Sequence, residues 1–520
     1  MAPTPFDTAL SAAYGFSEPA LILGAALDGT ATHPEPKVRI PLSMMNRHGL
    51  VAGATGTGKT KTLQLITEQL SAAGVPVFVA DMKGDLSGLA MPGPKAARVD
   101  ARATDTKYDW KPAGAPVEFV SLTGALGVQL RATVSSFGPL LLAKVLELND
   151  TQASVLSLVF KFCDDQQLPL LDFPDLRAVL QYLTGPDGKP ALVQYGGMSD
   201  ATVGVLLRKM IELEQQGAEK FFGEPEFDVK DLLHVTPDGR GVVTCLELSD
   251  VQDKPRLFST FMMWMLAQLY HNLPEAGDLP KPKLVFFFDE AHLLFDGASK
   301  AFLEQVQQVV RLIRSKGVGI YFVTQVPTDV PDDILAQLGH RVQHALRAHT
   351  PDDDKALNAT VRTFPRTTLF DLRETLTTLG IGEAAVTILD SRGVPTPVFP
   401  VRLIPPSSRM GPLTADELKT DIQQSDLLRE YGTAVDRESA RELLAARLAK
   451  SAPAAGAPMT PAGSPAAGGR TPMSTGAKIG TAVVAALGTT VARTVGRELV
   501  RGIFGMLGGS PSRGTTRSRW

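Results

Sequence analysis

The sequence predicts an α/β fold with a mainly parallel sheet, and three features of the chain support this prediction. A glycine-rich segment at residues 53–60 lies between an apolar run and a segment with helical spacing. Further strongly apolar runs alternate with helical patterns over most of the chain. One of these runs, at residues 283–288, ends directly in two acidic residues. Buried strands that alternate with helices are typical of a parallel sheet covered by helices.

The size and charge of the chain exclude few classes of protein. Its 520 residues correspond to about two to four domains. The 52 basic and 55 acidic residues nearly cancel, to a net charge of −3, so composition alone does not indicate nucleic-acid binding. A contact with nucleic acid would have to come from a local patch or from an assembled ring.

Cysteine usage and the chain start favour a soluble, cytoplasmic protein. The two cysteines, Cys163 and Cys245, are too few for a disulfide framework and fit a reducing compartment. The first ten residues have neither the basic start nor the apolar core of a secretory signal. The longest candidate membrane span, at residues 479–495, is interrupted by glycine, threonine and Arg493.

The N-terminal half of the predicted core begins after an irregular lead-in. Residues 1–40 form this lead-in, with one short strand expected at residues 37–42. The first part of the core, residues 41–138, contains two buried strands at residues 48–53 and 75–81. Leu63, Ile66 and Leu70 have helical spacing, which predicts a helix between these strands that Gly74 ends.

A change of pattern separates the two parts of the core. Residues 139–235 are rich in Leu, Ala, Gln and Glu at helical spacing and are predicted to be an inserted helical subdomain. The second part of the core, residues 236–405, is predicted to contain a helix and four strands, the last of them an edge strand: helix 258–273 and strands 241–248, 283–292, 318–325 and 341–349. A helical extension follows at residues 406–450.

The end of the chain has two further segments. Residues 451–475 consist mainly of Ala, Pro, Gly, Ser and Thr, which predicts a flexible linker. In the tail, residues 476–520, three arginines are spaced by four and lie on one helical face: Arg493, Arg497 and Arg501. We expect a basic amphipathic helix for self-association, docking or weak contact with a membrane surface, and a partly ordered tail is the alternative.

The strongest chemical signal is the segment GATGTGKT at residues 53–60, which matches the P-loop pattern G-x-x-x-x-G-K-[ST]. Glycines allow the backbone N–H groups to surround phosphates, and the following helix adds its positive N-terminal end. Lys59 is expected to reach the β- and γ-phosphates, and Thr60 to bind Mg²⁺. The alternative is a chance match, which the flanking strand and helix disfavour. The predicted nucleotide-binding residues are Gly53, Ala54, Thr55, Gly56, Thr57, Gly58, Lys59, Thr60 and Lys61.

A second signal is the acidic pair Asp289–Glu290 at the end of an apolar run. Asp289 is the candidate second residue of the Mg²⁺ site, and Glu290 is the candidate general base that polarises the attacking water. The alternative is a pair of helix-capping acids. A glutamate in this place favours ATP-driven mechanical work over a nucleotide kinase or a signalling GTPase, and no N-K-x-D element for guanine recognition is found.

Other polar residues are weaker candidates. Gln325 ends the strand that follows the acidic strand, and it is predicted to sense the γ-phosphate or hold the lytic water. Arg314, and less strongly Arg311 and Arg347, are candidates for an arginine that completes the site of a neighbouring subunit, with a solvated helix-end cation as an equal alternative.

The segment 81–85 (DMKGD) follows the second buried strand, where a ligand crevice is expected. Asp81 is a candidate for the water or metal shell, and Lys83 for contact with phosphate or nucleic acid. A loop turn with compensated charges is an equal alternative. The histidines show no metal-ligand spacing, so no structural metal is predicted and Mg²⁺ is expected only with ATP.

Taken together, these motifs resemble the HerA-like helicases of the FtsK–HerA superfamily, in a bacterial subgroup. The matching segments are RHGLVAGATGTGKT (47–60), VFVADMKGDLSG (77–88), LVFFFDEAHLLF (284–295), RSKGVGIYFVTQVPTDVPDDIL (314–335) and HALRAH (344–349). The resemblance implies a RecA-like core, a hexameric ring and ATP-driven movement of DNA through a central pore. It also implies the roles proposed above for Lys59, Thr60, Asp289, Glu290, Gln325 and Arg314.

The chain departs from archaeal HerA in two places. Its N-terminal region is too short for the β-barrel that precedes the archaeal core, and the tail after residue 450 has no counterpart there. A partnership with a nuclease is therefore in doubt. The spelling DEAH at residues 289–292 also occurs in superfamily 2 RNA helicases, but the arginine-rich element of their second domain is not found.

Two functions remain in competition at this stage. The first is a DNA-translocating or DNA-unwinding ATPase, which the resemblance favours. The second is a nucleotide-gated assembly switch that binds protein partners and moves nothing, which the balanced overall charge favours.

Overall fold

The computed structural model describes residues 4–296 and 298–451, and its centre is one twelve-stranded sheet. The strand order is β2-β1-β12-β11-β10-β3-β9-β8-β4-β7-β5-β6. The strands from β10 to β6 pair in parallel, whereas β11, β12, β1 and β2 are antiparallel to their neighbours. The predicted α/β class with a mainly parallel sheet is therefore confirmed.

The strands of the sheet, in chain order, are β1 (Ala20–Asp28), β2 (Ala31–Pro41), β3 (Gly49–Ala52), β4 (Val77–Asp81), β5 (Val117–Ser121), β6 (Val128–Gln129), β7 (Val243–Glu247), β8 (Leu284–Phe288), β9 (Val318–Thr324), β10 (His340–His344), β11 (Glu383–Thr387) and β12 (Phe399–Leu403). The helices that cover the sheet are α1 (Pro5–Tyr14), α2 (Lys59–Ala72), α3 (Ala97–Asp105), α10 (Pro255–Asn272), α11 (His292–Phe295), α12 (Lys300–Ile313), α13 (Asp332–Leu335), α14 (Pro351–Arg362) and α15 (Leu372–Thr378).

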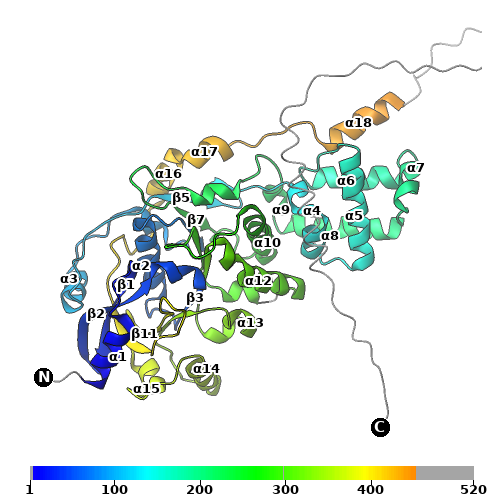
Figure 1. The fold of residues 1–520 in the computed structure, drawn as a ribbon. Helices are drawn as coiled ribbons and strands as arrows, with labels where there is room; N and C mark the ends of the chain where they lie inside the picture. The colour runs from blue at the N-terminus through cyan, green and yellow to red at the C-terminus, as the bar shows by residue number, and fades with distance from the viewer. Residues whose placement is uncertain (1–3, 297, 452–520) are drawn as a thin grey trace, which may run out of the picture.

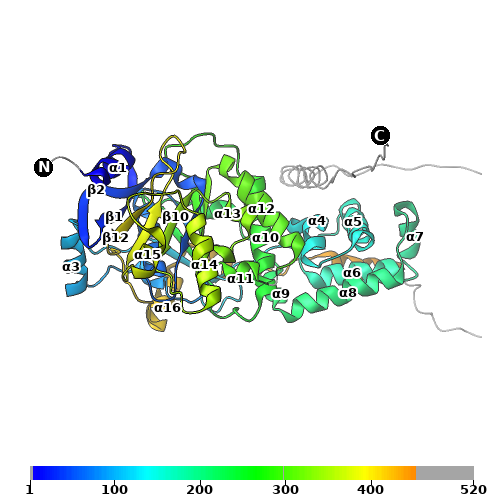
Figure 2. The ribbon, with the colours of Figure 1, turned by 90° about the horizontal axis from the view of Figure 1, so that it is seen from below.

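The central strands are apolar along their whole length because helices cover both of their faces. Every residue of β8 is buried. Because successive side chains of a strand point to opposite faces, Phe286 packs in the core with α10 and α12, and Phe287 packs in the core with α1 and α2. Figure 1 shows α10 and α12 beside the sheet, and Figure 2 shows the whole as an elongated molecule.

The N-terminal segment is more regular than expected. Instead of an irregular lead-in with one short strand, residues 5–41 form α1 and the antiparallel hairpin β1–β2. Strand β1 pairs with β12, whose residues lie almost 380 positions later in the chain. The expectation failed because this pairing depends on a partner that no local pattern identifies.

Strand β10 was predicted to be an edge strand, and this prediction is wrong. It lies between β3 and β11 and pairs with both. Strands β11 and β12, which the sequence analysis did not identify, extend the sheet on that side. The other predicted core strands and helices correspond to β3, α2, β4, β7, α10, β8 and β9.

A helical lobe stands beyond α10 and α12, at the end of the molecule away from α1 and β2 (Figures 1 and 2). Its helices are α4 (Val134–Val145), α5 (Asp150–Asp165), α6 (Phe173–Thr184), α7 (Lys189–Leu192), α8 (Asp200–Gln215) and α9 (Ala218–Phe221). These helices occupy most of the segment 139–235, for which helices were expected. Whether this lobe is a separate domain remains a prediction.

The segment after the core returns along the sheet and reaches the lobe. It contains α16 (Ala415–Gln424), α17 (Asp426–Tyr431) and α18 (Ala440–Ser451), and α18 packs against α6. The linker and the tail that were predicted after this segment lie outside the described residues from position 452 on. None of the helices in the described part of the chain has the length and apolar character needed to cross a membrane.

We predict that Tyr431 attaches this returning segment to the core. Its side chain is 1% exposed, its ring centroid lies 5.2 Å from that of Phe227, and its hydroxyl donates to Asp231 and accepts from the Asp228 N–H at 3.2 Å. Tyr431→Ala should lower the free energy of unfolding by about 3–5 kcal/mol, as for other buried aromatic truncations. Tyr431→Phe, the matched control, should cost only about 1–2 kcal/mol because it keeps the ring. Chemical denaturation measures both, and equal losses would contradict the packing role.

Candidate active site

The phosphate loop, residues 53–60, is fixed by main-chain hydrogen bonds from two neighbouring strands. It joins β3 to α2. The Gly53 N–H donates to the carbonyls of Thr324 and Gln325 at 3.2 and 3.0 Å, and the Ala54 N–H donates to the carbonyl of Ala345 at 2.9 Å. The loop is therefore held where β9 and β10 end, at the carboxyl edge of the parallel strands, where ligands bind in sheets of this kind.

Two glycines of this loop have backbone conformations that disfavour other residues. Gly53 has a φ of +153°, and a Cβ added to it would lie 2.4 Å from the Cβ of His344. Gly58, which precedes α2, has a φ of +117°. No side chain caps the N-terminus of α2, so the N–H groups of its first turn remain available for an anion.

Lys59 folds back over this loop. Its Nζ donates to the carbonyls of Gly53 at 2.7 Å and Ala54 at 3.3 Å, and the residue is 8% exposed. Burial lowers the pKa of Lys59, and the carboxylates of Glu290 and Asp289 oppose this shift. The lysine thus lies between the phosphate loop and the acidic pair.

The acidic pair follows β8 in a buried place. Glu290 is 5% exposed and has a φ of +48°, which is unusual for a residue with a side chain. Its Oε1 accepts an ion-paired hydrogen bond from the Lys83 ammonium, which is 47% exposed. Asp289 is 4% exposed, and its Oδ2 has no hydrogen-bond partner. Burial, followed by the neighbouring carboxylates of Asp81, Glu290 and Asp85, raises the pKa of Asp289 to about 7.

Three aspartates from two strand ends form a cluster that fits a divalent cation. Oxygen atoms of Asp81, Asp85 and Asp289 all lie within 4.8 Å of one another. Asp81 also accepts hydrogen bonds from three N–H groups of the loop that follows it, at 2.8–3.0 Å. Buried oxygens of Asp85 and Asp289 lack partners, and carboxylate oxygens are the ligands that Mg²⁺ prefers. The donor set therefore fits a magnesium ion.

The structure brings most of the other predicted residues to this crevice. Thr60 and Lys61 lie in the first turn of α2. Burial lowers the pKa of Lys61, and the carboxylates of Asp85 and Asp81 oppose this shift. Gln325 is exposed at the end of β9 and contacts the loop through its carbonyl. Lys83 was proposed to touch phosphate or nucleic acid, and its observed partner is Glu290.

Two of the candidate arginines, Arg314 and Arg311, lie away from this crevice in their own chain. Arg314 is exposed in the turn that precedes β9, so it lies at the opposite edge of the sheet from the phosphate loop. Arg311 is exposed in the last turn of α12, on the same side. Arg347 is exposed after β10, and its side chain makes no hydrogen bond to the phosphate loop in the described structure.

Some contacts of the site were not predicted from the sequence. The ion pair of Lys83 with Glu290 joins residues that are 207 positions apart. The contribution of Asp85 to the carboxylate cluster was also not predicted. His344 also supports the site, since its Nε2 lies 2.8 Å from the Thr62 hydroxyl of α2. Burial lowers the pKa of His344 to about 4, so its ring is neutral. The signal for Asp85 was its place after a strand parallel to β8, because both strands end at one edge.

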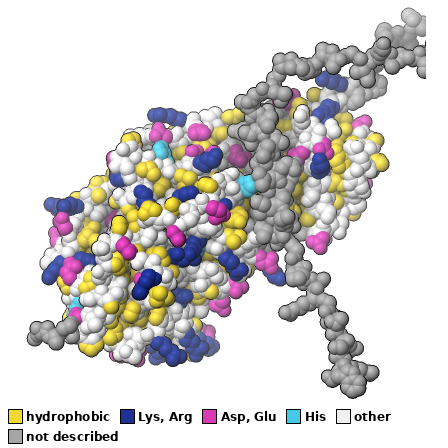
Figure 3. Space-filling model, viewed as in Figure 1, with side chains coloured by type: hydrophobic (Ala, Val, Ile, Leu, Met, Phe, Trp, Pro, Cys, Tyr) yellow, Lys and Arg dark blue, Asp and Glu magenta, His cyan; other side chains and the backbone are white. Residues whose placement is uncertain are grey.

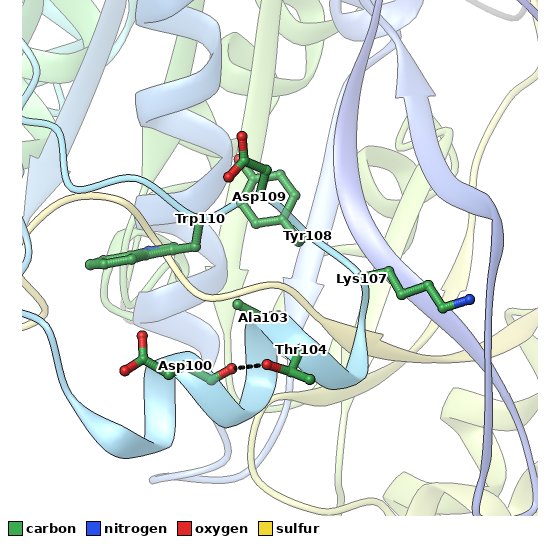
Figure 4. A pocket seen from close by; sticks show the side chains of 7 residues that line it. All are labelled: Asp100, Ala103, Thr104, Lys107, Tyr108, Asp109 and Trp110. Carbon is green, nitrogen blue, oxygen red and sulfur yellow. Dashed lines mark hydrogen bonds between the residues drawn. The ribbon is translucent and has the colours of Figure 1, made fainter.

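A separate hollow of about 400 Å³ lies outside this crevice, along α3 and the segment after it (Figure 4). Its two acids, Asp100 and Asp109, are exposed. Trp110 donates from its ring nitrogen to the Pro406 carbonyl at 2.8 Å, which is a structural contact. The hollow has no glycine-rich loop and no buried carboxylate, so the crevice at the phosphate loop is the candidate active site.

Comparisons with known proteins agree with this assignment. The family model described as helicase HerA-like C-terminal matches residues 28–513. No functionally curated protein matches the sequence. Several solved structures have a similar fold, although their TM-scores are below 0.5 and add nothing to the fold described above.

Three of these structures illustrate the likeness. The bacterial conjugative coupling protein TrwB, without its first 70 residues, has 16% identity, covers 76% of this chain and 92% of its own, and gives a TM-score of 0.49. Plasmid coupling protein TrwB in complex with ADP and Mg²⁺ has 15% sequence identity. The match covers 75% of this chain and 95% of TrwB, with a TM-score of 0.48. VirB4 of Thermoanaerobacter pseudethanolicus has 12% sequence identity. The match covers 75% of this chain and 97% of VirB4, with a TM-score of 0.47.

We predict that the charge on Asp289 destabilises the free protein at neutral and alkaline pH. Its pKa rises from 3.8 to about 7 on folding, so the folded state binds more protons and stability falls as pH rises through this window. Without divalent cations, Asp289→Asn should therefore raise the free energy of unfolding at pH 8 by about 1–4 kcal/mol, and change it little at pH 4. Thermal unfolding in a chelating buffer measures this, with exposed Asp278→Asn as the control. A gain that does not depend on pH would contradict the prediction.

Proposed function

Because this chain belongs to the helicase HerA-like C-terminal family of P-loop ATPases, we propose that it is an ATP-hydrolysing motor that moves along DNA or unwinds it. The observation that carries the proposal is the placement of a phosphate loop, a buried acidic pair and an aspartate cluster at one edge of a parallel sheet. A binding loop alone would support nucleotide binding, whereas a glutamate beside it supports hydrolysis.

The residues divide into those that bind the nucleotide and those that act on water. The N–H groups of residues 53–61 and the Lys59 ammonium bind the phosphates. Thr60 and Asp289, with Asp81 and Asp85 beside them, would hold Mg²⁺, which offsets the phosphate charge when it is bound. Glu290 accepts the proton of the attacking water. Gln325 orients this water or contacts the terminal phosphate.

The position of Arg314 supports the proposal of a ring of subunits. Within one chain this arginine lies at the sheet edge opposite to the phosphate loop. If it stabilises the charge of the reacting phosphate, it must do so in a neighbouring subunit. We therefore propose a homo-oligomer, most simply a hexameric ring, with DNA as the substrate and a cytoplasmic location. Contact of the tail with a protein partner or a membrane surface remains a weaker proposal.

The alternative function is a nucleotide-gated assembly switch that binds proteins and moves nothing. The observation that favours it is the distribution of charge. In Figure 3, Lys and Arg side chains lie in small groups among Asp and Glu over the face in view. A motor of this composition would have to build its positive DNA-binding surface from several subunits.

The rate of ATP hydrolysis with and without DNA distinguishes these functions. We expect single- or double-stranded DNA to increase the rate several-fold at low salt, and the increase to fall as salt rises because phosphate contacts release counterions. Lys59→Ala should abolish turnover by weakening ATP binding. Glu290→Gln should abolish turnover and retain ATP binding. A rate that no DNA changes would favour the switch, and normal hydrolysis by Glu290→Gln would show that Glu290 is not the base.

We also predict that Lys83 restrains Glu290 in the free protein. The ammonium that pairs with the Glu290 carboxylate competes with a water molecule for the same oxygen. Lys83→Met should therefore increase the basal ATPase rate by about 3–10-fold, as expected for a partly exposed ion pair worth about 1 kcal/mol. Lys83→Arg, which keeps the charge, is the matched control. A lower rate with methionine and a normal rate with arginine would show that the cation assists hydrolysis instead.

A further inference from the structure

A short loop that the sequence analysis did not single out lies directly against the phosphate loop. It consists of residues 380–382, between α15 and β11. The Gly382 N–H donates to the carbonyl of Thr57 at 2.9 Å. A Cβ added to Gly58 would lie 3.3 Å from the Gly382 nitrogen. The two loops are therefore in contact at the N-terminus of α2, where the phosphates of a nucleotide bind.

The topology of the sheet explains why this loop reaches the site. Strand β11 is antiparallel to β10, so β11 begins at the edge where β10 and β3 end. This edge also carries the phosphate loop. A nucleotide held there by its phosphates extends its ribose and base away from the loop, along the same edge of the sheet.

The loop presents one large apolar side chain and has few free polar groups. Ile381 is 70% exposed. The Ile381 carbonyl accepts from Arg102 Nη2 at 3.0 Å, and the Gly382 carbonyl accepts from Arg102 Nη1 at 3.2 Å. The Gly380 N–H donates to Glu383 Oε2 at 2.9 Å, and the Glu383 N–H donates to the Gly380 carbonyl at 3.1 Å. The groups that would recognise a ligand by hydrogen bonds are thus mostly used within the chain.

Arg102 holds this loop in place from α3. Its guanidinium bridges two successive carbonyls, which fixes the backbone directly after the Ile381 side chain. Glu383, at the start of β11, is in turn held by Arg402 at 2.9 Å. A loop held by two arginines loses little conformational freedom when a ligand contacts it, which favours binding.

We propose that Ile381 is the contact for the purine base of the bound nucleotide, and that Arg102 is a positioning residue for it. This inference rests on the proposed function, since it requires a nucleotide at the phosphate loop. An apolar side chain buries the face of a base without reading its polar edge. The site should therefore bind ATP and GTP with similar affinity and recognise the base less than the phosphates.

The experiment measures binding of ATP, GTP and inorganic tripolyphosphate to the full chain and to its variants. Ile381→Asp should lower the affinity for ATP and for GTP by about tenfold or more. It should leave the affinity for tripolyphosphate unchanged, because the phosphate loop is intact. Ile381→Ala should weaken both nucleotides by about 3–5-fold. In steady-state assays of ATP hydrolysis, both Ile381 variants should have a higher KM for ATP and nearly the same kcat as the wild-type chain. The matched control is Val394→Asp, because Val394 is 52% exposed in another turn.

The outcomes separate this inference from the proposed function. If the wild-type chain binds neither ATP nor tripolyphosphate, the proposed function fails. If it binds both and Ile381→Asp leaves ATP affinity unchanged, the base contact alone is overturned. If Ile381→Asp weakens tripolyphosphate as much as ATP, the loop supports the phosphate loop and does not contact the base. Arg102→Met should repeat the pattern of Ile381→Ala, and a strong preference for ATP over GTP would contradict an apolar contact.

Discussion

The position of the phosphate loop depends on main-chain hydrogen bonds from β9 and β10, and the rest of the site depends on that position. Gly53 and Ala54 donate to carbonyls at the ends of these two strands, so the loop cannot shift without breaking the sheet edge. Strand β9 lies between β3 and β8. This order places Gln325 between the loop and the acidic pair, and it sets the gap that a phosphate group and a water molecule would fill.

The site without a ligand has an unfavourable electrostatic arrangement. Asp289 and Asp81 are buried with raised pKa values, because burial and like charge both disfavour their ionised forms. On the other side, burial lowers the pKa of Lys59. A magnesium ion and a polyphosphate would compensate both groups at once.

Local patterns in the sequence predicted the elements whose folding is locally determined. β3, β4, β8 and β9 are continuous apolar runs. The residues at their ends define the site, and they are the glycines of the phosphate loop, Asp81, the acidic pair and Gln325. The pairing of β1 with β12 could not be predicted in this way, because its partners are far apart in the chain and β1 contains no motif. The neighbours of β10, the ion pair of Lys83 and the contact of the loop around Ile381 could not be predicted either, because their partners are also far apart in the chain. Each requires knowledge of which strand ends share an edge, and strand order is not a local property.

The two ends of β9 lie beside groups that would belong to the sites of different subunits. Its carboxyl end lies at the phosphate loop of its own chain, whereas Arg314, before its first residue, lies at the other edge of the sheet. If one chain supplies the loop and another supplies the arginine, the two surfaces that meet are different. Because the loop and Arg314 lie at opposite edges of the sheet, one two-fold contact cannot bring both pairs together, whereas contacts between different surfaces repeat around a ring or along an open helix. Under the proposed function, a ring is then the smallest arrangement in which every phosphate loop has an arginine from a neighbour, and each hydrolysis event becomes coupled to an interface between subunits.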